Sequence, residues 1–199
     1  MTAPVPGAVA GRILLDMGYT ESSPARRAGR VVVGVTGSPG SRAALLRAVQ
    51  AARDGGRTLV PVLAWTPAGG EMAARVAPSP SLDELHHQDA RARLDDAIRA
   101  ALGGPPDGVR ITPAVVRAPA ADALTVLADH PADLLVLGAG PRHRLARLLR
   151  GRVRRRVLSH AQAPVLLVRA PELPAPARRV LRRVSPEDFL GGTTAGPTR

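Results

Sequence analysis

The stretch "RVVVGVTGSPGSRAALLRAVQAARDGG" (residues 30–56) indicates the fold class of this chain. It begins with a β-branched run, which favours a buried β-strand, and Gly34 and Gly37 close that run. The rest has apolar residues at helical spacing, with Ser41 as the expected N-cap and Gly55 as the expected stop. The stretch therefore predicts a strand, a Gly-rich turn and a helix, which is the repeating unit of α/β proteins.

The same alternation continues along the chain. Helix 81–104 is expected to begin at an N-cap, Ser81. Continuous apolar strands separated by helices are typical of a parallel sheet that is covered on both faces and connected by right-handed crossovers. We therefore predict an α/β fold with a doubly wound, five-stranded parallel sheet and helices on both faces. After the opening strand and helix, strands are expected at 57–65, 109–117, 132–138 and 163–169, and helices at 81–104, 120–130 and 144–161.

The two ends of the chain differ in composition from its middle. Residues 1–29 are rich in Pro, Gly, Ala and Ser, which predicts a flexible N-terminal arm. Residues 170–199 form a Pro/Arg-rich C-terminal tail, within which a helix is indicated at 176–184. One domain is expected between them, at 30–169.

The charge balance points to partners that carry phosphate. The chain has 28 basic residues, all of them arginine, against 16 acidic residues, and its net charge is +12. The absence of cysteine excludes disulfides, thiolate metal sites and thiol catalysis. Because the sequence has neither an export signal nor an apolar run of about 20 residues, we expect no membrane span and a cytoplasmic location.

Arginines are concentrated after the fourth predicted strand. Eight of the fifteen residues in 142–156 are arginine, and no acidic residue occurs in 134–171. One interpretation is a face that binds nucleic-acid phosphates; the other is a solvated helix face, with arginine favoured by the codons of a GC-rich genome. Aromatic residues that could stack on bases are scarce. The candidate phosphate contacts are Arg142, Arg144, Arg147, Arg154 and Arg155.

The sequence contains no assembled catalytic group and no convincing metal site. The segment "DELHHQD" (83–89) places histidine and carboxylate side chains within one helical turn, but no second cluster completes a metal site. A solvated helix face explains it better. The Gly-rich turn 34–41 could bind an anion at the following helix N-terminus, although such turns are equally common for steric reasons.

Two parts of the chain together resemble the universal stress protein family. The strand "DLLVLG" ends at Gly138, Gly151 follows thirteen positions later, and "HAQAPVLLVR" (160–169) closes the segment. This resembles the family signature of Gly, two residues, Gly, nine residues, Gly and then Ser or Thr, followed by a helix and a last strand. The opening strand and helix are also similar to the family's, so the resemblance covers 30–169 in order.

The resemblance implies strand order 3-2-1-4-5, a homodimer through the last strand (163–169) and, in one subgroup, ATP bound between the loops after strands one and four. Gly138 matches the first glycine of the phosphate loop and Gly151 the third, while Gly140 lies one position before the second. Thr36 stands where nucleotide-binding members have an aspartate near the adenosine. Ala64 matches a residue that meets the adenine through its backbone.

Three positions depart from the family pattern. Pro141 stands where the second glycine is expected, and it removes an amide donor from the loop. Arg152 replaces the hydroxyl residue; it could clamp a phosphate or fill the pocket. Thr36 supplies no carboxylate.

These observations favour a universal stress protein that acts as a non-catalytic regulatory or stress-response module, with weakened or altered ATP binding. One alternative is a nucleic-acid- or ribosome-associated factor that uses the Arg-rich segment 142–156. An ATP-hydrolysing switch is a third, but neither a water-activating group nor a metal-held triphosphate can be assigned to residues of this chain.

Overall fold

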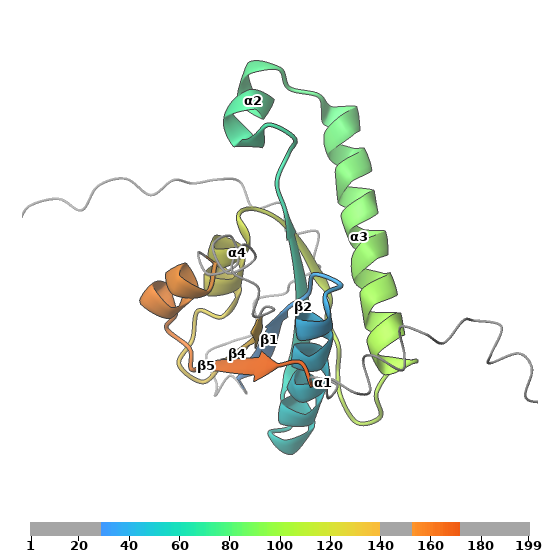
Figure 1. The fold of residues 1–199 in the computed structure, drawn as a ribbon, viewed down its shortest axis with the longest axis vertical. Coiled ribbons are helices and arrows are strands. Elements are labelled where there is room, and N and C mark those ends of the chain that lie inside the picture. The colour runs from blue at the N-terminus through green and yellow to red at the C-terminus, as the bar shows by residue number, and fades with distance from the viewer. Residues whose placement is uncertain (1–28, 140–152, 172–199) are drawn as a thin grey trace, which may run out of the picture.

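The computed structural model describes residues 29–139 and 153–171, and it contains a five-stranded sheet in the order β3-β2-β1-β4-β5 (Figure 1). Each neighbouring pair of strands is parallel. The predicted fold class and strand order are therefore confirmed. The elements are β1 (Arg30–Gly34), α1 (Pro39–Asp54), β2 (Thr58–Trp65), α2 (Gly70–Val76), α3 (Pro80–Leu102), β3 (Ala114–Arg117), α4 (Ala120–Leu127), β4 (Leu134–Ala139) and β5 (Val165–Arg169), with a further helix at 153–160.

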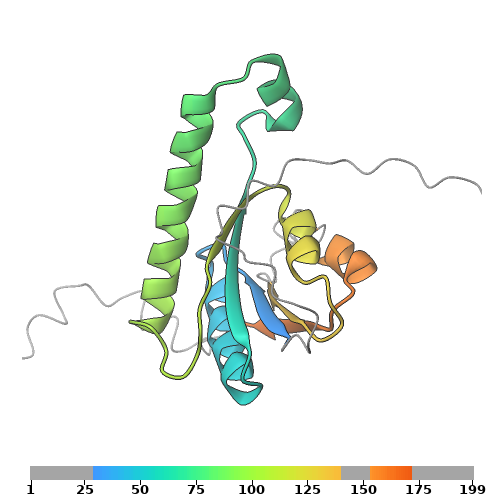
Figure 2. The ribbon, with the colours of Figure 1, turned by 180° about the vertical axis from the view of Figure 1, so that it is seen from behind.

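Helices cover both faces of the sheet, as Figures 1 and 2 show from opposite sides. Val31 and Val33 of β1 pack with α1 on one face, and Val32 packs with α4 and helix 153–160 on the other. All three valines are fully buried. Because successive side chains of a strand point to opposite faces, a continuous valine run is what a central strand of a two-sided sheet requires.

The two serines predicted as N-caps are not the N-cap residues of the structure, and the reason is the same for both helices. Helix α1 is capped by Ser38 rather than Ser41, and α3 begins after Ser79 rather than at Ser81. In each case a proline is the first helical residue, where its fixed φ fits and its missing N–H costs nothing. The serine before the proline is therefore the N-cap residue.

The third predicted strand is interrupted at Pro113. A single bridge joins Leu59 to Ile111, and regular pairing with β2 resumes only at Ala114. The Leu59 amide donates to the Arg110 carbonyl, and the Leu59 carbonyl accepts from the Thr112 amide, so both backbone groups of Leu59 face the third strand. Pro61 lies two residues further along β2, so its missing N–H faces the same strand, at the point where the pairing is interrupted. The interior strand β2 tolerates the proline at this interruption.

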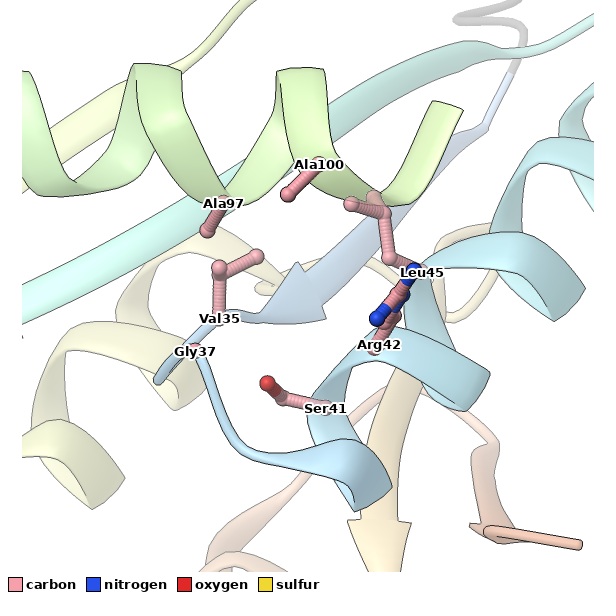
Figure 3. Close-up of a pocket in the computed structure, with 7 residues that line it drawn as sticks. All are labelled: Val35, Gly37, Ser41, Arg42, Leu45, Ala97 and Ala100. Carbon is pink, nitrogen blue, oxygen red and sulfur yellow. The ribbon is translucent and has the colours of Figure 1, made fainter. Parts of the chain in front are cut away.

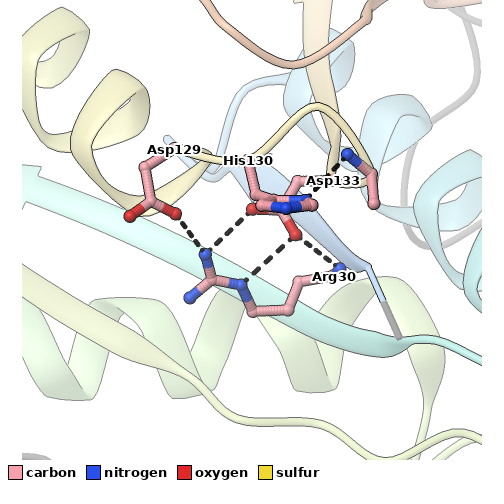
Figure 4. A network of polar contacts seen from close by, with 5 residues as sticks. Arg30, Asp129, His130 and Asp133 are labelled. Carbon is pink, nitrogen blue, oxygen red and sulfur yellow. Dashed lines mark hydrogen bonds and ion pairs between the residues drawn. The ribbon is translucent and has the colours of Figure 1, made fainter. Parts of the chain in front are cut away.

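A buried ion pair joins the beginning of β1 to the turn before β4 (Figure 4). The Asp133 carboxylate accepts hydrogen bonds from the Arg30 amide at 2.7 Å and from the Arg30 guanidinium at 2.9 Å. Its side chain is 1% exposed, and Arg30 also reaches the exposed Asp129. Burial raises the pKa of Asp133, but the hydrogen bonds and charge of Arg30 outweigh it, so the pKa lies below its usual value.

Replacing this carboxylate should destabilise the fold. We expect Asp133→Asn to lower the free energy of unfolding by about 3 kcal/mol at neutral pH, because it removes the buried charge that the Arg30 amide and guanidinium both bond, a contact that the exposed Asp129 does not replace. A depressed pKa stabilises the fold above the pKa of the unfolded state, and this stabilisation is lost as the pH falls through the folded-state pKa. The difference between wild type and variant should therefore shrink in urea denaturation as the pH falls below 3.8, the ordinary pKa of an aspartate.

Asp129→Asn is the matched control, since it removes the solvent-exposed carboxylate from the same guanidinium. It should cost less than about 1 kcal/mol, as surface ion pairs do. Equal losses in the two variants would contradict the assignment of Asp133 as the principal partner of Arg30.

Candidate functional site

The end of β4 touches the first turn of α1 where the strand order reverses, which is where doubly wound folds bind ligands. A Cβ atom added at Gly138 would lie 2.5 Å from the carbonyl carbon and oxygen of Gly40 and 2.8 Å from the amide nitrogen of Ser41. One added at Gly40 would lie 3.0 Å from the carbonyl oxygen of Ala139. The first turn of α1 therefore rests directly on the backbone at the end of β4, and Gly138 is required there for steric reasons.

Hydroxyl groups in the β1–α1 loop and the first turn of α1 bond one another and the nearby backbone. The Thr36 amide donates to Ser41 Oγ at 3.2 Å, and Thr36 Oγ1 lies 3.0 Å from Ser38 Oγ. Ser41 Oγ donates to the Ser38 carbonyl at 3.0 Å. Ser41 is buried, whereas Thr36 is exposed to solvent beyond the C-terminal end of β1.

Three of the predicted nucleotide contacts lie along one edge of the sheet. Thr36 follows β1, Ala64 is near the end of β2, where it pairs with Val116 of β3, and Gly138 is near the end of β4. The other three, Gly140, Gly151 and Arg152, lie outside the described residues. These assignments remain predictions.

A small hollow opens beside the β1–α1 loop (Figure 3). It lies between α1 and α3, its volume is about 70 Å³, and most of its lining is apolar. Nucleotide-sized ligands need pockets of roughly 300 Å³ or more. By itself this hollow is therefore too small for a nucleotide. The residues that line it are Val35, Gly37, Ser41, Arg42, Leu45, Ala97 and Ala100.

A second polar cluster, which the sequence did not predict, surrounds Arg117 at the end of β3. Its guanidinium bonds both carboxylate oxygens of Glu71 on α2, at 3.1 and 3.2 Å, and Asp83 on α3 at 2.5 Å. It also lies 5.5 Å from the centre of the Trp65 ring, whose other neighbour is the His86 ring at 5.9 Å. One arginine thus fastens α2 and α3 to the sheet.

In the segment "DELHHQD", Asp83 binds Arg117 and His86 packs on Trp65, so these two side chains are not the solvated face that the sequence suggested. Within residues 29–139 and 153–171, no group of three histidine or carboxylate side chains could hold a metal ion. One signal in the sequence could have indicated this cluster. It is Trp65, the only tryptophan of the chain, which stands at the end of a predicted strand.

Helix 153–160 exposes part of the predicted phosphate-binding face. Arg154 and Arg155 are exposed, whereas Arg156 bonds Asp122 of α4 at 2.7 Å. Arg142, Arg144 and Arg147 lie outside the described residues, so their role in binding nucleic acid remains a prediction. None of the helices that the structure describes is both long and apolar enough to cross a membrane.

The sequence model of the universal stress protein family matches residues 28–169. This chain belongs to the universal stress protein family. The match spans all five strands, so the predicted family is confirmed. A search of curated proteins finds no match.

The chain is similar to several solved universal stress proteins. UspA from Lactobacillus plantarum is 22% identical with a TM-score of 0.53, over 72% of this chain and 99% of that one. A universal stress protein in complex with cAMP is 32% identical with a TM-score of 0.43, over 72% of this chain and 98% of the other. The universal stress protein from Archaeoglobus fulgidus in complex with dAMP is 18% identical with a TM-score of 0.46, over 70% and 97%.

The contact between the end of β4 and the first turn of α1 can be tested at Gly138. We expect Gly138→Ala to lower the free energy of unfolding by about 2 kcal/mol, because the new methyl group displaces the first turn of α1. Gly104→Ala is the control: a Cβ there meets open space, and the change should stay within about 0.5 kcal/mol. Urea denaturation measures both values, and equal effects would contradict the steric role of Gly138.

Proposed function

We propose that this universal stress protein is a non-catalytic regulatory protein that binds adenine nucleotides weakly at the ends of β1, β2 and β4. The observation that carries the proposal is the backbone contact of Gly138 with Gly40 and Ser41. It brings the N-terminus of α1, with its positive dipole end, beside the end of β4, the strand whose Gly138 begins the glycine signature. A phosphate bound at the end of β4 would lie next to α1.

Two features support weak binding. Thr36, which stands in place of the family's aspartate, offers a hydroxyl that already bonds Ser38 and an amide that already bonds Ser41. Thr36 also lacks the carboxylate that would accept hydrogen bonds from a ribose. In the sequence, Pro141 removes one amide donor from the phosphate loop. Arg152 retains its two alternative roles, as a clamp on the phosphate or a plug in the pocket.

Restoring the carboxylate should strengthen binding. We expect Thr36→Asp to raise the affinity for ATP about tenfold, which is the effect of one charge-assisted hydrogen bond of about 1.4 kcal/mol. Thr36→Asn is the matched control, because it has the same shape without the charge and should leave the affinity within about twofold. Isothermal titration calorimetry with ATP measures both. The proposal fails if the wild type already binds as tightly as the aspartate variant, or if no variant binds.

We further propose that the protein forms a homodimer through residues 163–169. Within the described residues, β5 pairs with β4 on one side only. An open edge of this kind is a ready template for association with another chain. Leu167 of β5 is 38% exposed, which provides apolar area at that edge.

Leu167→Arg should weaken this dimer. Introducing a charge into an apolar contact between chains should raise the dimer dissociation constant at least about tenfold. Val126→Arg is the control, because Val126 is similarly exposed but lies on α4, away from β5. Sedimentation velocity over a concentration series measures the dissociation constant. A monomeric wild type, or a dimer unaffected by Leu167→Arg, would exclude this interface.

A further inference from the structure

Helix α2 and the N-terminal half of α3 rise past the end of the sheet, and we call residues 70–89 the arm (Figures 1 and 2). Helix α2 buries none of its residues. In the part of the chain that the structure describes, eight large apolar side chains are exposed, and four of them lie on the arm. They are Met72 at 70%, Val76 at 84%, Leu82 at 45% and Leu85 at 60% exposure.

The arm is held firmly enough to present these side chains as a surface. Arg117 binds Glu71 on α2 and Asp83 on α3 together, and Trp65 packs beneath on His86. These polar contacts anchor the inner side of the arm. Leu82 and Leu85, three residues apart on α3, share one stripe of the helix and remain exposed. Exposed apolar side chains that are held in place on an anchored helix are typical of a surface that binds a partner.

The charge of this region selects the kind of partner. Residues 70–89 contain four acidic residues and one arginine, a net charge of −3, which becomes −2 when Arg117, the partner of Glu71 and Asp83, is counted; the whole chain carries +12. The chain outside residues 70–89 therefore carries +15. An arginine-rich apolar segment is repelled by most of this protein and attracted to the arm.

The chain contains such a segment in its C-terminal tail, "ARRVLRRV" (177–184). Its apolar residues Ala177, Val180, Leu181 and Val184 follow the i, i+3, i+4, i+7 spacing of an amphipathic helix, and all its other residues are arginine. Helices of this kind bind apolar surfaces with their apolar stripe, while charged side chains at its margins reach acidic groups on the partner.

The distance also fits. All five strands are parallel, so β5 ends on the same side of the sheet as β2 and β3, next to which the arm begins. Four strand spacings of roughly 4.8 Å separate β5 from β3, about 19 Å in all. The eight residues from Arg169 to Ala177 reach about 26 Å when extended. The segment can therefore reach the arm of its own chain.

We propose that residues 177–184 dock on the apolar, acidic face of the arm in the same chain. The segment buries Leu82, Leu85 and neighbouring apolar side chains, and its arginines face the carboxylates of α3. The docked segment covers part of the region that holds four of the eight exposed large apolar side chains of the described residues. It also removes four arginines from the cationic surface of the protein.

The absence of cysteine allows a direct test on the full chain. A nitroxide attached to Ser185→Cys, beside the segment, broadens amide signals that lie close to it in space. In the ¹⁵N-labelled protein, we expect the signals of residues 72–85 to be lost in the oxidised sample and restored by reduction, while those of α4 persist. Even attenuation across the whole domain would overturn the proposal.

Leu82→Ser with Leu85→Ser, in the same labelled chain, should restore the arm signals. Leu46→Ser is the matched control, because Leu46 is 50% exposed on α1 and its loss should leave the broadening unchanged. In a mixture of ¹⁵N chains without nitroxide and unlabelled chains with it, the arm signals should persist. Their loss in that mixture would assign the segment to a second copy and overturn docking within one chain.

Discussion

The close approach of Gly138 to Gly40 and Ser41 is the constraint on which the ligand edge of this protein depends. No side chain fits between the end of β4 and the first turn of α1, so these two elements meet through their backbones. A glycine that looks like part of a phosphate-binding signature therefore has a packing role whether or not a nucleotide is bound. Loss of nucleotide affinity during evolution would not release this position, because the contact between β4 and α1 would still require it.

The two ends of the sheet have different roles. At the N-terminal ends of β1 and β4, Asp133 is buried and bonded to Arg30, and the pair fixes the register of two central strands. At the C-terminal ends, Thr36 is exposed and Ala64 is partly exposed, and both match predicted nucleotide contacts. The buried Arg30–Asp133 pair is thus separated from the candidate ligand contacts by the length of the strands, whereas the Arg117 cluster, which holds α2 and α3, lies at the same end as those contacts.

The sequence predicted the sheet because apolar periodicity is a local property. The valine run of β1 and the helical spacing after it are each sufficient to identify their element. Helix α2 was missed because it buries no residue and begins with Gly69 and Gly70, both at positive φ. The Arg117 cluster was missed because Glu71 and Asp83 lie 46 and 34 residues away in sequence, and no local pattern links them. Only the fold, which brings β3 beside β2 and α3, creates that cluster.

The end of β2 contributes one residue to the candidate nucleotide site and one to the base of the arm. Ala64 packs toward the α4 face and Trp65 toward the α3 face, since adjacent residues of a strand point to opposite sides. Ala64 is the residue matched to the adenine contact, and Trp65 supports Arg117 and His86 at the base of the arm. The Trp65 carbonyl also accepts a hydrogen bond from the Ala118 amide, which follows Arg117 directly. A shift of the β2 backbone on ligand binding would therefore move Trp65 and, through the hydrogen bond to Ala118, the neighbouring Arg117. The peptide bond between Ala64 and Trp65 thus connects the candidate nucleotide site to the residues that hold the arm.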